Sequence, residues 1–181
     1  MEYTFKNNLA EKPVTVTLGE YSLSLNTDGR ETLIPYANII SVRLTKSRKR
    51  FVTIIKPADQ PEVHISNQYR HSNNQYENRS SQYVTFVRVL HFHLKEKSMA
   101  YYICGNNLQN ILLASCACVI VAFGLSYVFD DFQINPFNNN ITALILSLSS
   151  ISLIAIVNWG HFPNVYKAGN IPSQFLPILE A

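Results

Sequence analysis

Three histidines carry the most specific chemistry in this sequence, because imidazole is a common protein ligand of zinc. Residues 82–94 alternate in polarity, and we expect them to form a long strand. On a strand, His91 and His93 point to the same face, and His64 lies on a strand that could neighbour it. No carboxylate or cysteine is placed to complete a metal site. We therefore favour structural or surface histidines and expect no metal.

The densest run of charge lies just before Phe51 and comprises Lys46, Arg48, Lys49 and Arg50. Clustered cations attract anionic lipid or phosphate groups, so a lipid- or phosphate-binding site is one interpretation. We favour the alternative of a charged hairpin tip that keeps a turn hydrated. Nucleic acid is a third interpretation, but the run is short and Phe51 is its only aromatic neighbour. We therefore expect no nucleic-acid partner.

Enzymatic motifs are missing from the sequence. It has no glycine-rich phosphate loop, no GxSxG and no HExxH, and the chain of 181 residues has only six glycines. The cysteines Cys104, Cys116 and Cys118 have no convincing zinc or disulfide spacing. We predict a protein that is not an enzyme and has no cofactor.

Short segments in which apolar and polar residues alternate dominate residues 1–107. The same residues include 14 basic and 9 acidic side chains, a net charge of +5. Asp28-Gly29 predicts a hairpin turn, and the polar residues 70–81 predict a loop or a hairpin tip. We expect no helix in this part, which makes it mainly β, a sandwich or a partly open barrel. The expected strands cover residues 14–18, 21–25, 32–36, 39–45, 51–56, 63–69, 82–94 and 99–104.

One stretch resembles a known family. EYSLSL and, after a turn, TLIPYANIISVRL are similar to the opening of bacterial PH-like and GRAM-like domains, which place an "IPY.NI..V" element where a strand begins. The resemblance covers about 30 residues and implies a binding or scaffolding module whose loops can contact phosphate headgroups. A PH domain ends with an amphipathic helix over one mouth of its barrel. Here we expect the last strand to lead directly into an apolar run.

Two apolar runs, residues 111–129 and 141–159, contain no charged side chain. As helices each would span roughly 28 Å, about the thickness of a bilayer core. We predict a transmembrane hairpin over residues 108–159 with an acidic loop at 130–140; the alternative is a pair of buried helices. Because 14 of the 15 basic residues precede the first run, both termini are expected in the cytoplasm, in a bacterial inner membrane.

Small side chains recur along both runs and could let helices pack closely. The stripe predicts packing within one hairpin or contact between copies, with a pore lined by serines as a sharper alternative. The residues that we assign to this face are Ala114, Cys118, Ala122, Ser126, Ser147 and Ser150.

Residues 160–181 form an apolar tail interrupted by three prolines. So apolar a segment should lie on the membrane surface or dock on the β-rich domain.

The sequence thus predicts three parts: a cytoplasmic PH-like domain (1–107), a transmembrane hairpin (108–159) and a tail (160–181). We expect a membrane-anchored binding or assembly module whose partners are the lipid bilayer and further copies of itself, with another protein as a possible partner. The alternatives are an oligomeric effector that permeabilises membranes and an accessory or immunity protein that binds another membrane protein.

Overall fold

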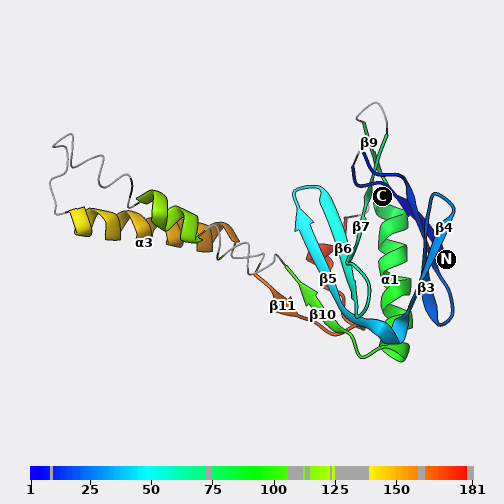
Figure 1. Cartoon of the computed structure of the whole chain (residues 1–181). Coiled ribbons are helices and arrows are strands. Elements are labelled where there is room, and N and C mark those ends of the chain that lie inside the picture. Colours follow the sequence, from blue (N-terminus) through cyan, green and yellow to red (C-terminus); the bar gives the residue numbers. More distant parts are fainter. Residues whose placement is uncertain are drawn as a thin grey trace. The chain divides into compact units, whose positions relative to one another are not determined.

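The computed structural model describes residues 1–8, 10–71, 75–105, 112, 115–122, 124, 139–158 and 162–178. The chain folds as two compact units (Figure 1). The first, which we call the β-rich unit, combines Met1–Gly105 with Asn164–Ala181. The second, the apolar unit, is Asn106–Pro163. The β-rich unit is therefore built from two separate pieces of the chain.

An antiparallel four-stranded sheet opens the β-rich unit, with strands in sequence order. These strands are β1 (Glu2–Phe5), β2 (Val14–Leu18), β3 (Ser22–Thr27) and β4 (Arg30–Pro35). Asp28 and Gly29 connect β3 to β4 with φ of 57° and 79°. Positive φ at both central residues is typical of a type I′ turn, so the predicted hairpin is confirmed.

A five-stranded sheet follows, in the order β11-β10-β5-β6-β7. After the 3-10 turn η1 (Tyr36–Asn38), β5 (Ile39–Ser47), β6 (Arg50–Pro57) and β7 (Val63–Ser66) form an antiparallel meander. β10 (Tyr101–Cys104) joins the other side of β5 in parallel, and β11 (Asn164–Val165) pairs antiparallel with β10. The β-rich character predicted for residues 1–107 is confirmed.

The segment expected to be the longest strand is instead the helix α1 (Ser80–Lys97), so the expectation of a β domain without a helix is wrong. The alternation of Val84, Phe86 and Arg88 suggested a strand, but the buried positions follow helical spacing. They are Tyr83, Val84, Phe86, Val87, Leu90, His91 and Leu94. Neighbours three and four apart share a helix face, and packing of that face outweighs the strand preference of valine and aromatic residues.

A hairpin of β8 (Gln68–Arg70) and β9 (Tyr76–Asn78) occupies most of the predicted loop at 70–81. The structure thus agrees with the hairpin alternative for this segment, although its last residues belong to the start of α1. The three residues between His71 and Gln75 lie outside the described part of the chain.

One core joins α1 to both sheets. The Tyr3 hydroxyl on β1 donates to the carbonyl of Ser66 on β7 at 2.6 Å, and the hydroxyls of Tyr83 and Thr53 lie 2.7 Å apart. These buried hydroxyl groups thus have partners on other elements, which offsets the cost of burying them.

The C-terminal tail docks on the β-rich unit, which is the second of the two alternatives above. β11 pairs with β10 in the register Ile103↔Val165 and Cys104↔Asn164. Phe175, in the 3-10 turn η3 (Ser173–Phe175), and Leu176 are buried in the core. The apolar unit is consequently an insertion in the connection between two paired strands.

The apolar unit contains α3 (Asn139–Asn158), and residues 115–122 are also helical. Among the residues that the structure describes, no helix is both long and apolar enough to cross a membrane. This finding contradicts the predicted transmembrane hairpin over 108–159, and with it the predicted location as an integral inner-membrane protein with cytoplasmic termini. The prediction relied on the length and lack of charge of residues 111–129 and 141–159, but the described helical stretch 115–122 would rise only about 12 Å at 1.5 Å per residue, too little for a bilayer core.

Candidate functional site

The predicted basic residues lie at the tip of the β5–β6 hairpin. Ser47 pairs with Arg50, so the turn consists of Arg48 and Lys49, and both are exposed. Arg48 has φ of 52°, a left-handed conformation that is unfavourable for a residue with a Cβ. The Lys46 ammonium lies 5.3 Å from the centre of the Phe51 ring, and the Arg50 guanidinium donates to Asn7 Oδ1 at 3.3 Å.

A buried asparagine holds this tip against two other segments. Asn67 accepts a hydrogen bond from the Phe51 backbone N–H at 2.8 Å and donates to the Lys49 carbonyl at 3.3 Å. It also donates to the Ser80 hydroxyl at the start of α1, at 3.0 Å. Because Asn67 is only 2% exposed, these bonds compete little with water. Asn67 was not predicted as a site residue. Its only signal in the sequence is a polar side chain, and in the structure it lies between β7 and β8.

Further cations come from distant parts of the sequence to this end of the unit. The Arg70 backbone N–H donates to the Lys6 carbonyl at 3.2 Å, and the Arg79 side chain donates to the Thr4 carbonyl at 2.9 Å. We call the whole set the basic edge; the sequence identified four of its seven members. They are Lys6, Lys46, Arg48, Lys49, Arg50, Arg70 and Arg79.

Two tyrosines accompany these cations. The Arg79 guanidinium lies 4.2 Å from the centre of the Tyr69 ring, and that of Arg70 lies 5.2 Å from the centre of the Tyr76 ring. Glu77 accepts two hydrogen bonds of 2.9 Å from Arg79. These bonds lower the pKa of the Glu77 carboxyl, and His71 contributes further.

The three histidines do not converge on a metal. His91 and His93 lie on a helix, where residues two apart point to different faces. The His93 ring stacks on Tyr36 at 5.5 Å, and His64 lies 3.7 Å from Glu62. Within the described part of the chain, no group of three or more His, Cys, Asp or Glu side chains could hold a metal ion.

His91 is a buried structural histidine. Its Nδ1 lies 2.7 Å from the Val87 carbonyl, which can only accept, so Nδ1 carries the proton. Nε2 therefore accepts from the Tyr166 hydroxyl at 2.7 Å, and this bond connects α1 to the tail. Burial lowers the pKa of His91 to about 4, although the bond to Val87 opposes the shift.

Two further tail contacts surround that bond. The Tyr102 ring lies 5.5 Å from His91 and 5.7 Å from Tyr166, and its buried hydroxyl has no hydrogen-bond partner among the described residues. The Cys104 thiol donates to the Asn164 carbonyl at 3.4 Å, and burial raises the pKa of this thiol. These groups are enclosed by the core, and we assign them to anchoring of the tail.

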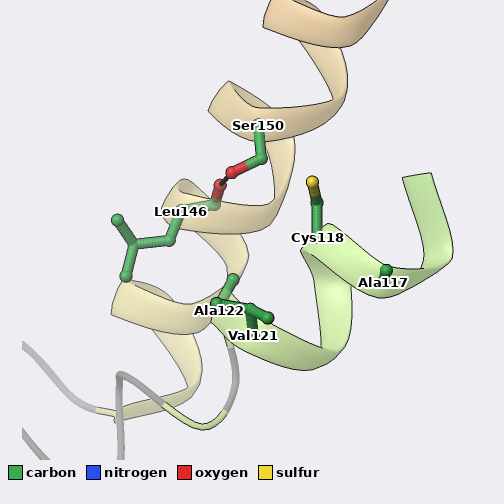
Figure 2. A pocket seen from close by; sticks show the side chains of 6 residues that line it. All are labelled: Ala117, Cys118, Val121, Ala122, Leu146 and Ser150. Carbon is green, nitrogen blue, oxygen red and sulfur yellow. Dashed lines mark hydrogen bonds between the residues drawn. The ribbon is translucent and has the colours of Figure 1, made fainter. Parts of the chain in front are cut away.

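The apolar unit contains a shallow hollow of about 230 Å³ between residues 117–122 and α3. Figure 2 shows the lining residues, with Cys118 and Ala122 on one helical stretch and Leu146 and Ser150 on α3. Three of the predicted packing residues, Cys118, Ala122 and Ser150, therefore line one space, and Ser147 is buried as well. The other two, Ala114 and Ser126, lie outside the described residues.

The serines of α3 are used within the helix. Ser149 and Ser150 both donate to the Leu146 carbonyl, at 2.9 and 2.7 Å, and Ser152 donates to that of Leu148 at 2.8 Å. Such bonds satisfy the hydroxyl locally and leave the apolar surface of the helix as its main means of contact.

Large apolar side chains are exposed on both helical stretches of the apolar unit. Their exposure ranges from 39% to 72%. They are Leu112, Ile120, Val121, Ile141, Leu144, Ile145, Leu148 and Ile151.

Comparisons with known proteins found no matching family model, no matching curated protein and no matching solved structure. The function is therefore inferred from the geometry of the chain itself.

Proposed function

We propose that this protein is a non-enzymatic assembly module. The apolar unit holds several copies of the chain together, and the β-rich unit presents the binding surface of the assembly. The observation that carries the proposal is the set of eight exposed apolar side chains on residues 112–151.

So many large apolar side chains on one small unit are costly to leave in water. Burial of a leucine or isoleucine side chain contributes about 1.5–3 kcal/mol, and contiguous exposed apolar surface is typical of interaction sites. A second copy offers the same surface, and no charged side chain lies between residues 112 and 124 or within α3 to oppose the contact. Identical surfaces that complement each other lead naturally to closed, symmetric assemblies.

The order of elements in the β-rich unit supports the PH-like interpretation. A four-strand meander is followed by the β5–β7 meander, the β8–β9 hairpin and then α1, whose apolar face joins the common core; β10 and β11 come after this helix. The sequence analysis expected this final helix to be missing. PH-like modules bind and scaffold other molecules, which agrees with a β-rich unit that presents partners on an assembled core.

The mass of the purified protein tests the proposal, measured by size-exclusion chromatography with light scattering. We expect a single species whose mass is a whole-number multiple of 20.6 kDa. Leu144→Lys combined with Leu148→Lys places two charges one turn apart on exposed positions of α3, and should reduce the mass to that of one chain.

The control is Met99→Lys, which puts the same charge on a 99% exposed apolar position of the β-rich unit. It should leave the mass unchanged. A monomeric wild-type protein would overturn the proposal and favour an accessory protein with a different partner. A broad range of masses that both variants change alike would indicate non-specific aggregation and would also contradict it.

A further inference from the structure

We propose that the basic edge of the β-rich unit binds single-stranded nucleic acid. The inference is independent of self-assembly, because it concerns a different surface and different residues. It also revises the expectation from sequence, which rejected nucleic acid because Phe51 was the only aromatic residue near the basic run.

The charge of this surface is the first argument. Seven cations meet at one end of the unit, connected by the hydrogen bonds of Asn67, Arg70 and Arg79. They come from the residue after β1, the β5–β6 hairpin, β8 and the N-cap of α1. Among the described residues, hydrogen bonds place two carboxylates nearby. Glu77 is paired with Arg79, and Glu11 accepts from Asn8. Positive charge therefore exceeds negative charge at the basic edge, and such an edge attracts a polyanion.

The second argument is the aromatic residues. Phe51 itself is 7% exposed and unable to stack on a base. The fold instead brings Tyr69 and Tyr76 to the cations, and Tyr76 is 55% exposed. Aromatic rings beside arginine and lysine are how proteins bind unpaired bases and the phosphate backbone together.

These features favour a nucleic acid over other anionic partners. The exposed turn, Arg48 and Lys49, has no apolar side chain to insert into a lipid surface, and a purely acidic peptide gains nothing from the exposed Tyr76 ring. Arg48 also occupies a left-handed conformation in which glycine costs less. A cation held in an unfavourable backbone conformation at an exposed position points to a binding role.

Fluorescence anisotropy with a labelled 20-nucleotide oligothymidylate, titrated with the full-length protein at several salt concentrations, tests this inference. We expect binding that weakens steeply with salt. Arg48→Gln combined with Lys49→Gln should weaken binding at least tenfold and reduce the slope of log affinity against log salt by about 1.4, since each phosphate contact on a single strand contributes about 0.7.

Tyr76→Ala separates stacking from charge. It should weaken binding roughly five- to hundredfold, the usual effect of losing one base stack, and leave the salt slope unchanged. The matched control is Lys56→Gln combined with Lys95→Gln, which removes two exposed charges at the far ends of β6 and α1. It should retain both affinity and slope.

Several results would overturn the inference. One is the absence of oligothymidylate binding at low salt by a protein whose circular dichroism shows that it is folded. Equal losses in the control and the Arg48/Lys49 variant would indicate attraction by overall charge alone. Binding to phosphatidylserine vesicles but not to the oligonucleotide would assign the surface to lipid instead.

Discussion

The two units of this chain differ in where their polar side chains find hydrogen-bond partners and in how far their apolar side chains are buried. In the β-rich unit, buried polar groups bond across the core, as Tyr3 does with Ser66, Tyr83 with Thr53, and His91 with Tyr166. In the apolar unit, the serines of α3 bond to their own helix and the leucines and isoleucines are exposed. The β-rich unit therefore completes its core within one chain, whereas the apolar unit leaves large apolar side chains exposed, which the proposed assembly would bury.

This difference agrees with the way the units are connected. The apolar unit is inserted where β10 and β11 pair, and that pairing brings its two ends together. An insertion between paired strands adds little constraint to the rest of the fold, so the β-rich unit should tolerate its removal. The predictions below test this separation.

Removal of the insertion should give the largest effect. We expect a chain in which a short Asn-Gly linker replaces residues 106–163 to fold, because Cys104 and Asn164 are already neighbours across strands. It should also lose self-association completely. Hydrogen exchange of the core strands and light scattering measure the two results. A chain that fails to fold would show that the units depend on each other.

Loss of the tail's aromatic anchor should be nearly as severe. Phe175 is 2% exposed within the core of the β-rich unit, so Phe175→Ala should reduce the free energy of unfolding by about 3–5 kcal/mol. Urea denaturation measures this. Ile178→Ala, at a 90% exposed position of the same tail, should change stability by less than about 0.5 kcal/mol. Similar values for the two variants would contradict docking of the tail.

Acid should also weaken docking of the tail, through the hydrogen bond between His91 and Tyr166. Its pKa falls from 6.5 in the unfolded chain to about 4 in the fold, so the unfolded state binds the extra proton between these values. Above about pH 6.5, His91 does not lower the free energy of unfolding, because it is neutral in both states. As the pH falls, protonation of the unfolded chain lowers this free energy, by about 3 kcal/mol near pH 4. Urea denaturation from pH 7 to 4 should show this slope, and His91→Gln should flatten it. His64→Gln, at an exposed histidine, should not, and an unchanged slope in His91→Gln would place the acid-sensitive group elsewhere.

Relief of the turn strain should have the smallest effect. Arg48→Gly removes the Cβ from a residue with φ of 52° and should stabilise the β-rich unit by roughly 0.5–1 kcal/mol, measured by thermal unfolding. Lys49→Gly is the matched control, because φ of Lys49 is not positive; glycine there should destabilise slightly. A loss of stability in Arg48→Gly would mean that the arginine side chain stabilises the turn.

The strands of the two meanders were predictable because each depends on local signals. Residues 14–18 alternate in polarity and form β2 with those bounds, and Asp28-Gly29 forms its turn through positive φ. The helix α1 was not predicted. Its valines and aromatic residues suit either structure locally, although Lys95 and Lys97 in the last turn were a signal for a helix terminus. The membrane prediction relied on the length and lack of charge of two runs, and no described helix is both long and apolar enough to cross a membrane.

The basic edge and the anchored tail depended on tertiary structure. The sequence identified Lys46, Arg48, Lys49 and Arg50, because they are adjacent. It could not place Lys6, Arg70 and Arg79 beside them, because the hydrogen bonds that do so join residues up to 75 positions apart. The sequence by itself thus determined the alternating strands, the turn and the two apolar runs, whose causes act over a few residues. Only the tertiary structure decided that residues 80–97 are helical, that the tail closes the core and that scattered cations share one edge, because each of these depends on contacts between distant segments.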